Sequence, residues 1–293
     1  MTSPLSAPGD AARELGGRLR AEQIRAEVAA LAAELTELGT RPRLAVVIAT
    51  ADESSAWYVR SLARAAAKSG LACDLVELGA EAAPEQIRET LEALGADPAV
   101  HGVILQTPLP EGAVAAELAA SLAPEQDVDG ANPLSLGRLA AGQPAFAPAT
   151  AEAVVELLDA HGIALSGRTV AVVGRSTVVG KPLAHLLLDR DATVTVCHSR
   201  TADLAAVTRR ADIVVAAAGR PGLITGAHVG PGAVVVDVGT NPTPEGGLVG
   251  DVDAASVGAR AAALSPVPGG VGPITTALLL RHTVQAAARR TGR

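Results

Sequence analysis

Short runs of apolar residues alternate with amphipathic stretches along the first half of the chain. The runs, each suited to one strand, lie at 44–49, 71–78 and 102–106. Continuous runs are typical of parallel strands, because both faces of a parallel sheet are covered. Helical spacing links them, first in a helix that Ser54 or Ser55 caps and Gly70 closes, then in one that begins at Pro84. With an amphipathic helix over 11–38 in front, this order predicts a parallel α/β sheet.

The second half repeats the alternation after a break. Residues 124–148 are punctuated by proline and carry little regular pattern, which indicates a domain boundary near residue 148. Helices are predicted at 151–160 and 274–288, and strands at 169–173, 192–197, 213–217 and 233–238.

The fold class predicted from these patterns is α/β, with two domains. The first spans 1–148 and is completed by a C-terminal helix within 274–293, and the second is a Rossmann-like domain over 149–273. A Gly- and Pro-rich excursion at 241–250 interrupts the second domain.

The charge, the cysteines and the lengths of the apolar runs exclude several classes of protein. The 293 residues carry 24 Lys and Arg against 31 Asp and Glu, a net charge of −7, which argues against a general nucleic-acid binder. Cys73 and Cys197 lie far apart and have no metal-like spacing. No run approaches the ~20 apolar residues of a membrane span, and the polar N-terminus is unlike a signal peptide. We expect a cytoplasmic protein without a membrane or nucleic-acid partner.

A glycine-containing turn, GRSTVVGKP at 174–182, follows a predicted strand and opens a helix. Glycines let backbone amides approach a phosphate, and the helix presents its positive N-terminal end. The spacing does not fit a P-loop, which has one residue fewer between its glycines and a hydroxyl where Pro182 stands. The pattern favours a nucleotide site over a tight strand-to-helix turn without a ligand.

The next strand ends in CHSRT at 197–201, where a Rossmann unit meets the adenosine ribose. An acidic residue there would favour NAD, whereas Arg175 and Arg200 can neutralise a 2′-phosphate. NADP is therefore the predicted cofactor, and the alternative is that Arg200 only solvates a helix start. The predicted cofactor-binding residues are Gly174, Arg175, Ser176, Val179, Gly180, Ser199, Arg200 and Thr240.

Together with these two stretches, three more resemble one family: QTPLP at 106–110, DVDG at 127–130 and the Gly/Pro loop SPVPGGVGPIT at 265–275. In this order they resemble the motifs of the bifunctional methylenetetrahydrofolate dehydrogenase/cyclohydrolase family. The resemblance implies two α/β domains with a cleft between them, tetrahydrofolate held by the first, NADP held by the second, and a homodimer. It also implies a role in one-carbon metabolism and purine biosynthesis, and no metal.

The resemblance assigns roles to individual residues. Tyr58 matches the tyrosine that stacks on the folate, Gln106 the cleft glutamine and Asp129 the aspartate that grips the pterin; these three are the predicted catalytic residues. Pro268, Gly269 and Gly270 match the loop that lines the folate site.

The chain departs from the family where the catalytic lysine is expected. The pattern Ser-x-x-Tyr-Val-x-x-Lys begins at Ser55 and ends here in Leu62, on the helix face that Tyr58 shares. Gln126 replaces a lysine before DVDG, Asn132 a histidine, and PATA at 148–151 replaces PCTP, which suggests an altered folate pocket.

The two family reactions make different demands on the lysine position. Hydride transfer to NADP needs aligned partners, whereas hydrolysis of the methenyl group needs a positioned acid or base worth ~10²- to 10⁴-fold. The sequence predicts NADP-dependent oxidation of methylenetetrahydrofolate and leaves the cyclohydrolase activity open because of Leu62. A folate-binding paralogue without catalysis and an NADP-dependent dehydrogenase for another small substrate are the alternatives.

Overall fold

The computed structural model describes residues 12–243 and 246–292. The chain divides into two compact units. Unit 1 holds the residues up to Ala21 and Thr150–Thr275, and unit 2 holds Glu22–Ala149 and the residues from Thr276 on. Two long helices, α1 (Arg18–Glu37) and α10 (Val271–Arg290), each begin in unit 1 and continue into unit 2.

Unit 2 is built on a three-stranded parallel sheet in the order β3-β2-β4. Its strands are β2 (Arg43–Ile48), β3 (Ala72–Glu77) and β4 (Gly102–Gln106). Its own helices are α2 (Glu53–Lys68), α3 (Pro84–Ala96), α4 (Ala115–Ala119) and α5 (Pro133–Ala140). The central strand β2 is buried along almost its whole length, as its apolar run predicts.

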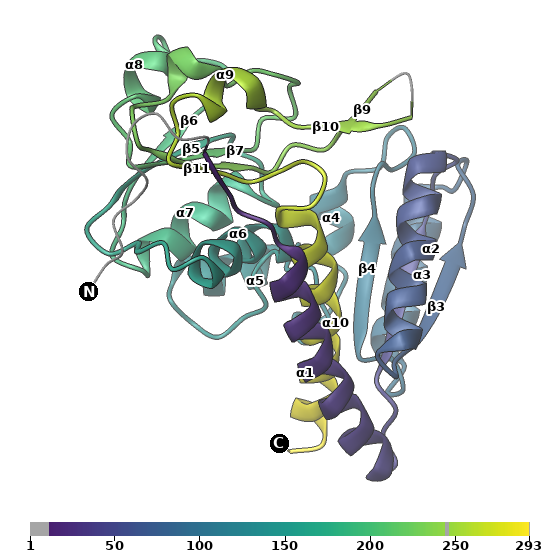
Figure 1. The fold of residues 1–293 in the computed structure, drawn as a ribbon. Coiled ribbons are helices and arrows are strands. Elements are labelled where there is room, and N and C mark those ends of the chain that lie inside the picture. Colours follow the sequence, from purple (N-terminus) through teal and green to yellow (C-terminus); the bar gives the residue numbers. More distant parts are fainter. Residues whose placement is uncertain (1–11, 244–245, 293) are drawn as a thin grey trace. The chain divides into compact units, whose positions relative to one another are not determined.

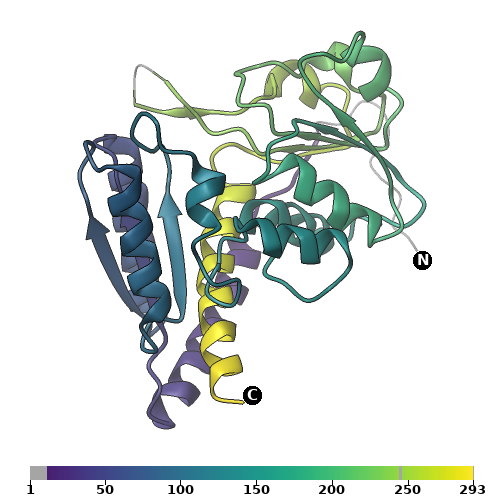
Figure 2. The same cartoon turned by 180° about the vertical axis from the view of Figure 1, so that it is seen from behind.

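The sheet of unit 2 lies between α2 on one face and α3 on the other, as the front and back views show (Figure 1, Figure 2). This arrangement follows from two right-handed crossovers that run in opposite directions across the sheet, from β2 to β3 through α2 and from β3 to β4 through α3. Ala45 and Val47 of β2 pack with Ile87 and Leu91 of α3 in one core cluster. In the C-terminal halves of α1 and α10, Leu31 and Leu35 pack with Ala287 and Ala288.

Unit 1 contains a six-stranded sheet in the order β1-β11-β8-β7-β5-β6, with all pairs parallel. The strands are β1 (Arg13–Glu14), β5 (Thr169–Val173), β6 (Thr193–Cys197), β7 (Ile213–Ala216), β8 (Val234–Asp237) and β11 (Ala263–Leu264). The other elements are α6 (Ala149–Ala160), α7 (Gly180–Leu188), α8 (Leu204–Thr208), the 3₁₀ helix Gly226–His228 and α9 (Ala254–Gly258). In both views α8 and α9 lie on one side of this sheet and α6 and α7 on the other (Figure 1, Figure 2).

The predicted α/β class is confirmed, and the differences are local. The helix predicted over 11–38 begins only at Arg18; Ala11 lies outside the described residues, and Arg13–Glu14 pair with β11 instead. Residues 241–250 form a short antiparallel pair, β9 (Asn241–Pro242) and β10 (Leu248–Val249), where no strand was predicted. The last helix starts at Val271, three residues earlier than predicted.

Helix capping also differs from the prediction. Asp52, not Ser54 or Ser55, is the N-cap of α2, and its carboxylate accepts from the Ser55 amide at 2.7 Å. Within 124–148, where no element was predicted, α5 begins at Pro133 after the N-cap Asn132, whose side chain accepts from the Leu134 amide at 2.7 Å. Among the described residues, none of the helices combines the length and apolar character needed to cross a bilayer.

Candidate functional site

Helix α2 separates its residues into a buried stripe and an exposed face. Val59, Leu62 and Ala66 are buried at helical spacing, and Tyr58 lies at the edge of this stripe, partly exposed. Leu62 is only 1% exposed, so a side chain at this position meets the interior of unit 2. The exposed face of α2 carries the basic side chains of Arg60, Arg64 and Lys68. None of these three side chains lies on the buried stripe, where the family pattern places its lysine.

The end of β4 is joined to the start of α2. The carbonyl of Thr107 accepts from Gln106 Nε2 at 2.6 Å and from Ser55 Oγ at 3.2 Å. Gln106 stands opposite Ile48 in the register of β2 and β4. The predicted glutamine therefore lies at the carboxyl end of the sheet, where α/β proteins bind ligands.

The DVDG turn extends the sheet beside β4. Val103 forms a parallel bridge with Asp127, and its amide donates to the Gln126 carbonyl at 2.8 Å. The carboxylate of Asp127 accepts from the amides of Ala131 at 2.9 Å and Asn132 at 2.8 Å. Asp127 is thus occupied in holding the turn.

Burial and neighbouring charges raise the pKa values of both Asp129 and Tyr58. Burial raises the pKa of Asp129 to about 7, with the charge of Asp127 acting in the same direction and that of His282 opposing both. Burial also raises the pKa of Tyr58 to about 12; the charge of Asp129 adds to this, and a side-chain hydrogen bond with Thr276 opposes it. Near neutral pH, Tyr58 therefore remains a hydroxyl and Asp129 can gain or lose a proton.

His282 of α10 is a site residue that sequence analysis missed. Its Nδ1 lies 2.7 Å from the Val128 carbonyl, directly before Asp129, and must donate because a carbonyl only accepts. The imidazole stacks on Phe146 with 4.9 Å between ring centroids, and the Arg289 guanidinium lies 4.5 Å from the Phe146 centroid. The available signal was a single histidine within the apolar stretch of the last helix.

Two departures from the family pattern have structural explanations. Gln126 is 1% exposed and its Nε2 donates to the Val100 carbonyl at 2.8 Å, while Asn132 caps α5 and donates to the Leu122 carbonyl at 2.7 Å. Both side chains hold backbone inside unit 2, and their effect on the folate pocket stays a prediction. Leu62, at the predicted lysine position, has no polar group to offer in place of the amine.

The Gly/Pro loop at 265–275 belongs to unit 1, whereas Tyr58, Gln106 and Asp129 belong to unit 2. Within unit 1, the Gly269 carbonyl accepts from the Gly17 amide at 2.8 Å. A Cβ on Gly17 would collide with the Gly270 carbonyl oxygen, which explains the glycine that precedes α1. Pro268 is exposed at the loop's tip.

The turn after β5 is closely packed backbone that only glycine allows, and we call it the phosphate cradle because of its place before α7. A Cβ on Gly174 would collide with the Ala217 carbonyl oxygen, and one on Gly180 with the Gly174 carbonyl oxygen, so only glycine fits at either position. The Ser176 hydroxyl accepts from the Val179 amide at 3.1 Å and keeps the turn in shape. This cradle, at the start of a nine-residue helix, fits a dinucleotide pyrophosphate.

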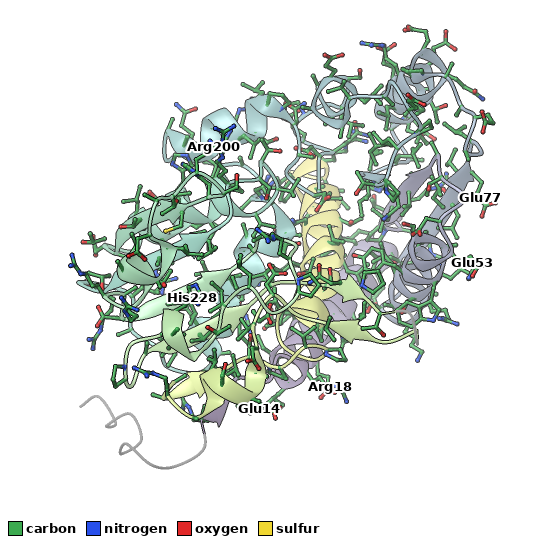
Figure 3. All side chains as sticks on the ribbon, turned by 90° about the horizontal axis from the view of Figure 1, so that it is seen from above. Glu14, Arg18, Glu53, Glu77, Arg200 and His228 are labelled. Carbon is green, nitrogen blue, oxygen red and sulfur yellow. The ribbon has the colours of Figure 1, made fainter. Side chains whose placement is uncertain are left out.

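The end of β6 supplies the predicted ribose end of the crevice. Ser199 and Arg200 are exposed there, and Figure 3 shows Arg200 on the surface of unit 1. The turn is fixed locally, since the Thr201 hydroxyl accepts from the His198 amide at 2.9 Å. Arg175 is likewise exposed, and Thr240 is exposed beyond the end of β8. Unit 1 thus brings all the predicted cofactor residues to the carboxyl edge of one sheet.

Comparison with known proteins agrees with this arrangement of a Rossmann-type unit and a second α/β unit. The model of the tetrahydrofolate dehydrogenase/cyclohydrolase catalytic domain matches residues 15–129, and that of the family's NAD(P)-binding domain matches 148–291. The bifunctional protein FolD 1 of Saccharopolyspora erythraea is 67% identical over 289 residues, which cover 99% of each chain. FolD 1 of Rhodococcus jostii is 65% identical over 94% of this chain and 93% of its own.

Solved structures give the same result. The methylenetetrahydrofolate dehydrogenase-cyclohydrolase (FolD) of Trypanosoma brucei, complexed with NADP cofactor and an inhibitor, has a TM-score of 0.92 and 38% identity, covering 97% of this chain and 100% of its own. The Campylobacter jejuni FolD has a TM-score of 0.92 and 36% identity, covering 96% of this chain and 100% of its own. The chain belongs to the tetrahydrofolate dehydrogenase/cyclohydrolase family.

Proposed function

We propose that this protein oxidises methylenetetrahydrofolate to methenyltetrahydrofolate with NADP, and that Leu62 makes it a poor hydrolase of the methenyl product. The observation that carries the proposal is on α2, which presents Tyr58 at the edge of its buried stripe and places Leu62, 1% exposed, at the lysine position. The charge of Asp129, in the DVDG turn, acts on Tyr58 and raises its pKa further. The two bifunctional relatives and the NADP-complexed Trypanosoma enzyme support the reaction and the cofactor.

The cofactor is held by unit 1 in this proposal. The turn at Gly174 and Gly180, which opens α7, suits the pyrophosphate, and Arg175 and Arg200 neutralise the 2′-phosphate. NADP, when bound, supplies the hydride acceptor. The predicted division of labour, NADP in 149–273 and folate in 1–148 with 274–293, is part of the same proposal.

In this proposal the folate is recognised by the side chains that the sequence analysis assigned to it. In its ionised form Asp129 accepts from the N–H groups of the pterin, and ionisation is available because its pKa lies near 7. Tyr58 offers its ring to the folate and keeps its proton. Gln106 completes the catalytic set, and Pro268, Gly269 and Gly270 are the predicted loop against the substrate. We also propose that the protein is a cytoplasmic homodimer, as the family resemblance implies.

Oxidation and hydrolysis use this site differently. Loss of hydride from methylenetetrahydrofolate needs the donor carbon aligned with its acceptor, which bound folate and a rigid loop can provide. Hydrolysis needs a group that activates water and moves protons as the adduct collapses. Leu62 offers only methyl groups, and the arginines of α2 are exposed and stay protonated.

The test of the oxidation is NADP reduction by the purified protein with methylenetetrahydrofolate as substrate. We expect substrate-dependent NADPH formation, with a clear preference for NADP over NAD at matched concentrations. A protein that binds tetrahydrofolate but forms no NADPH would contradict the proposal and favour the binding paralogue. NADPH formation with other small substrates but not with the folate would favour the second alternative.

A further inference from the structure

Two buried carboxylates lie at the carboxyl edge of the unit 1 sheet. Asp237 ends β8 and is 4% exposed, and Asp251 follows β10 and is fully buried at 0%. Charged side chains are rarely this buried unless they are fully hydrogen-bonded. The partners of these two show what they hold in place.

Asp251 binds the loop that follows β7. Its Oδ2 accepts from the amides of Ala218 at 2.6 Å and Gly219 at 2.8 Å, and its Oδ1 accepts from the Arg220 amide at 2.8 Å. A fourth donor, Asn241 Nδ2, lies 2.9 Å from Oδ1. One carboxylate therefore fixes three successive backbone amides and connects them to the segment after Thr240.

Asp237 in turn fixes Asp251. Its Oδ1 accepts from the Asp251 amide at 2.9 Å, and its Oδ2 accepts from the Val252 amide at 3.0 Å. A Cβ on Gly250 would collide with the Asp237 carboxylate, and one on Gly239 would collide with the Asp251 carboxylate, so both glycines are needed for the close approach. Asp237, Asp251 and residues 218–220 thus form one connected unit.

The 218–220 loop is one wall of the predicted dinucleotide crevice. β5 has β6 on one side and β7 on the other, so the chain reverses direction across the sheet at β5. With the pyrophosphate over the Gly174 turn and the adenosine over β6, the second nucleoside extends over the end of β7. The two loops touch, since Gly174 lies directly against the Ala217 carbonyl.

We propose that Asp251 is a positioning residue for the nicotinamide half of the cofactor, acting by holding the 218–220 wall in shape. This inference rests on the proposed NADP-dependent function. It goes further by dividing the cofactor site into an adenosine end that is independent of Asp251 and a nicotinamide end that depends on it.

The test compares a whole cofactor with one half of it. Titration calorimetry measures the binding of NADP and of 2′,5′-ADP, which contains only the adenosine half, to the parent, to Asp251→Asn and to Asp253→Asn. The matched control Asp253 caps α9 two residues further on, and its carboxylate accepts from the Ser256 amide. Because the new amide turns N–H groups toward N–H donors, we expect Asp251→Asn to weaken NADP about 10-fold or more and 2′,5′-ADP less than about 2-fold. Asp253→Asn should change neither affinity.

Unchanged NADP affinity in a folded Asp251→Asn protein would overturn the inference. Equal losses for NADP and 2′,5′-ADP would do the same, because they would reveal only a general folding role. In steady state, we expect the NADP KM to rise while the folate KM stays constant. Should Asp251→Asn not fold, Asn241→Ala removes a side-chain donor to Asp251. The same selective loss, smaller in size, is then expected, and its absence would overturn the inference.

The parent protein tests the proposed cofactor separately. It must bind 2′,5′-ADP more tightly than 5′-AMP if NADP is the cofactor. Failure there would count against the NADP assignment, whereas the difference between parent and Asp251→Asn decides the role of Asp251.

Discussion

The two units prepare their sites in different ways. In unit 1 the predicted crevice is lined by backbone: Gly174 and Gly180 let the chain pack closely at its turn, and the Asp251 carboxylate accepts from three successive amides. In unit 2 one acid, Asp127, holds backbone in the same manner, while the pKa of its neighbour Asp129 is raised to about 7 by burial. The difference teaches that changes at the unit 1 glycines and at Asp251 should act through shape, and changes at Asp129 in unit 2 through charge.

The largest effect should come from forcing the backbone of the phosphate cradle apart. Gly180→Ala introduces a Cβ that collides with the Gly174 carbonyl oxygen, a backbone atom that cannot move aside cheaply. We expect NADP binding to weaken about 100-fold or more, on the order of 3 kcal/mol, with tetrahydrofolate binding retained. Gly258→Ala is the matched control, because nothing lies within 4 Å of its Cβ. Similar NADP affinity in both variants, measured by calorimetry, would remove the distinction between the units.

The paired acids of DVDG should separate binding from stability. Asp129→Asn should lose about 1.5–3 kcal/mol of tetrahydrofolate binding, since a charged acceptor is replaced by an amide. Asp127→Asn should instead lower the free energy of unfolding by about 1–3 kcal/mol, because the amides of Ala131 and Asn132 lose a charged acceptor. Denaturant unfolding and folate titration of both variants measure the two losses separately. Equal losses of folate affinity and of stability in Asp129→Asn and Asp127→Asn would contradict separate roles for the two acids.

Arg200 should discriminate between the cofactors. If its guanidinium contacts the 2′-phosphate, Arg200→Ala should weaken NADP by about 1–3 kcal/mol and leave NAD nearly unchanged. Arg210, also exposed in unit 1, supplies the control Arg210→Ala. Comparable losses for NADP and NAD in the Arg200 variant would argue that this residue is only solvated.

A smaller effect should follow pH. The pKa of Asp129 is raised to about 7, so its ionised form, which accepts from the pterin, is lost as pH falls through that value. The folate KM should then rise roughly 10-fold between about pH 8 and pH 6, and Asp129→Asn should flatten the profile. Because the charge of His282 lowers the pKa of Asp129, His282→Leu should move the midpoint to higher pH. A parent profile without a midpoint near neutrality would exclude Asp129 as the titrating group.

The features predicted from sequence are those that a local pattern encodes. The strands at 44–49 and 169–173 are continuous apolar runs, and Gly174 and Gly180 stand at a strand-to-helix turn, so each has a signal within a few residues. The capping pair Asn132 and Pro133 was also a readable signal for α5, hidden in a segment rich in proline.

The features that were missed depend on partners far away in the chain. Arg13–Glu14 become a strand because of β11, some 250 residues later, which no local propensity contains. Asp251 and His282 gain their roles from amides and carbonyls of other segments, at 218–220 and Val128. The burial of Leu62, by contrast, agrees with its helical spacing, and its meaning came from the family pattern rather than from the residue alone.

The loss of a proton-handling group at Leu62 is tested most directly by two rates on one protein sample, NADP reduction with methylenetetrahydrofolate and loss of methenyltetrahydrofolate. We predict rapid NADP reduction and methenyl loss no faster than the spontaneous reaction, with methenyl loss raised about 10-fold or more in Leu62→Lys. The Lys methylenes can occupy the leucine's space, and Leu62→Met, which fills it without an ammonium, should leave both rates as in the parent. Enzymatic methenyl loss by the unmodified protein, clearly above the spontaneous rate, would contradict the claim.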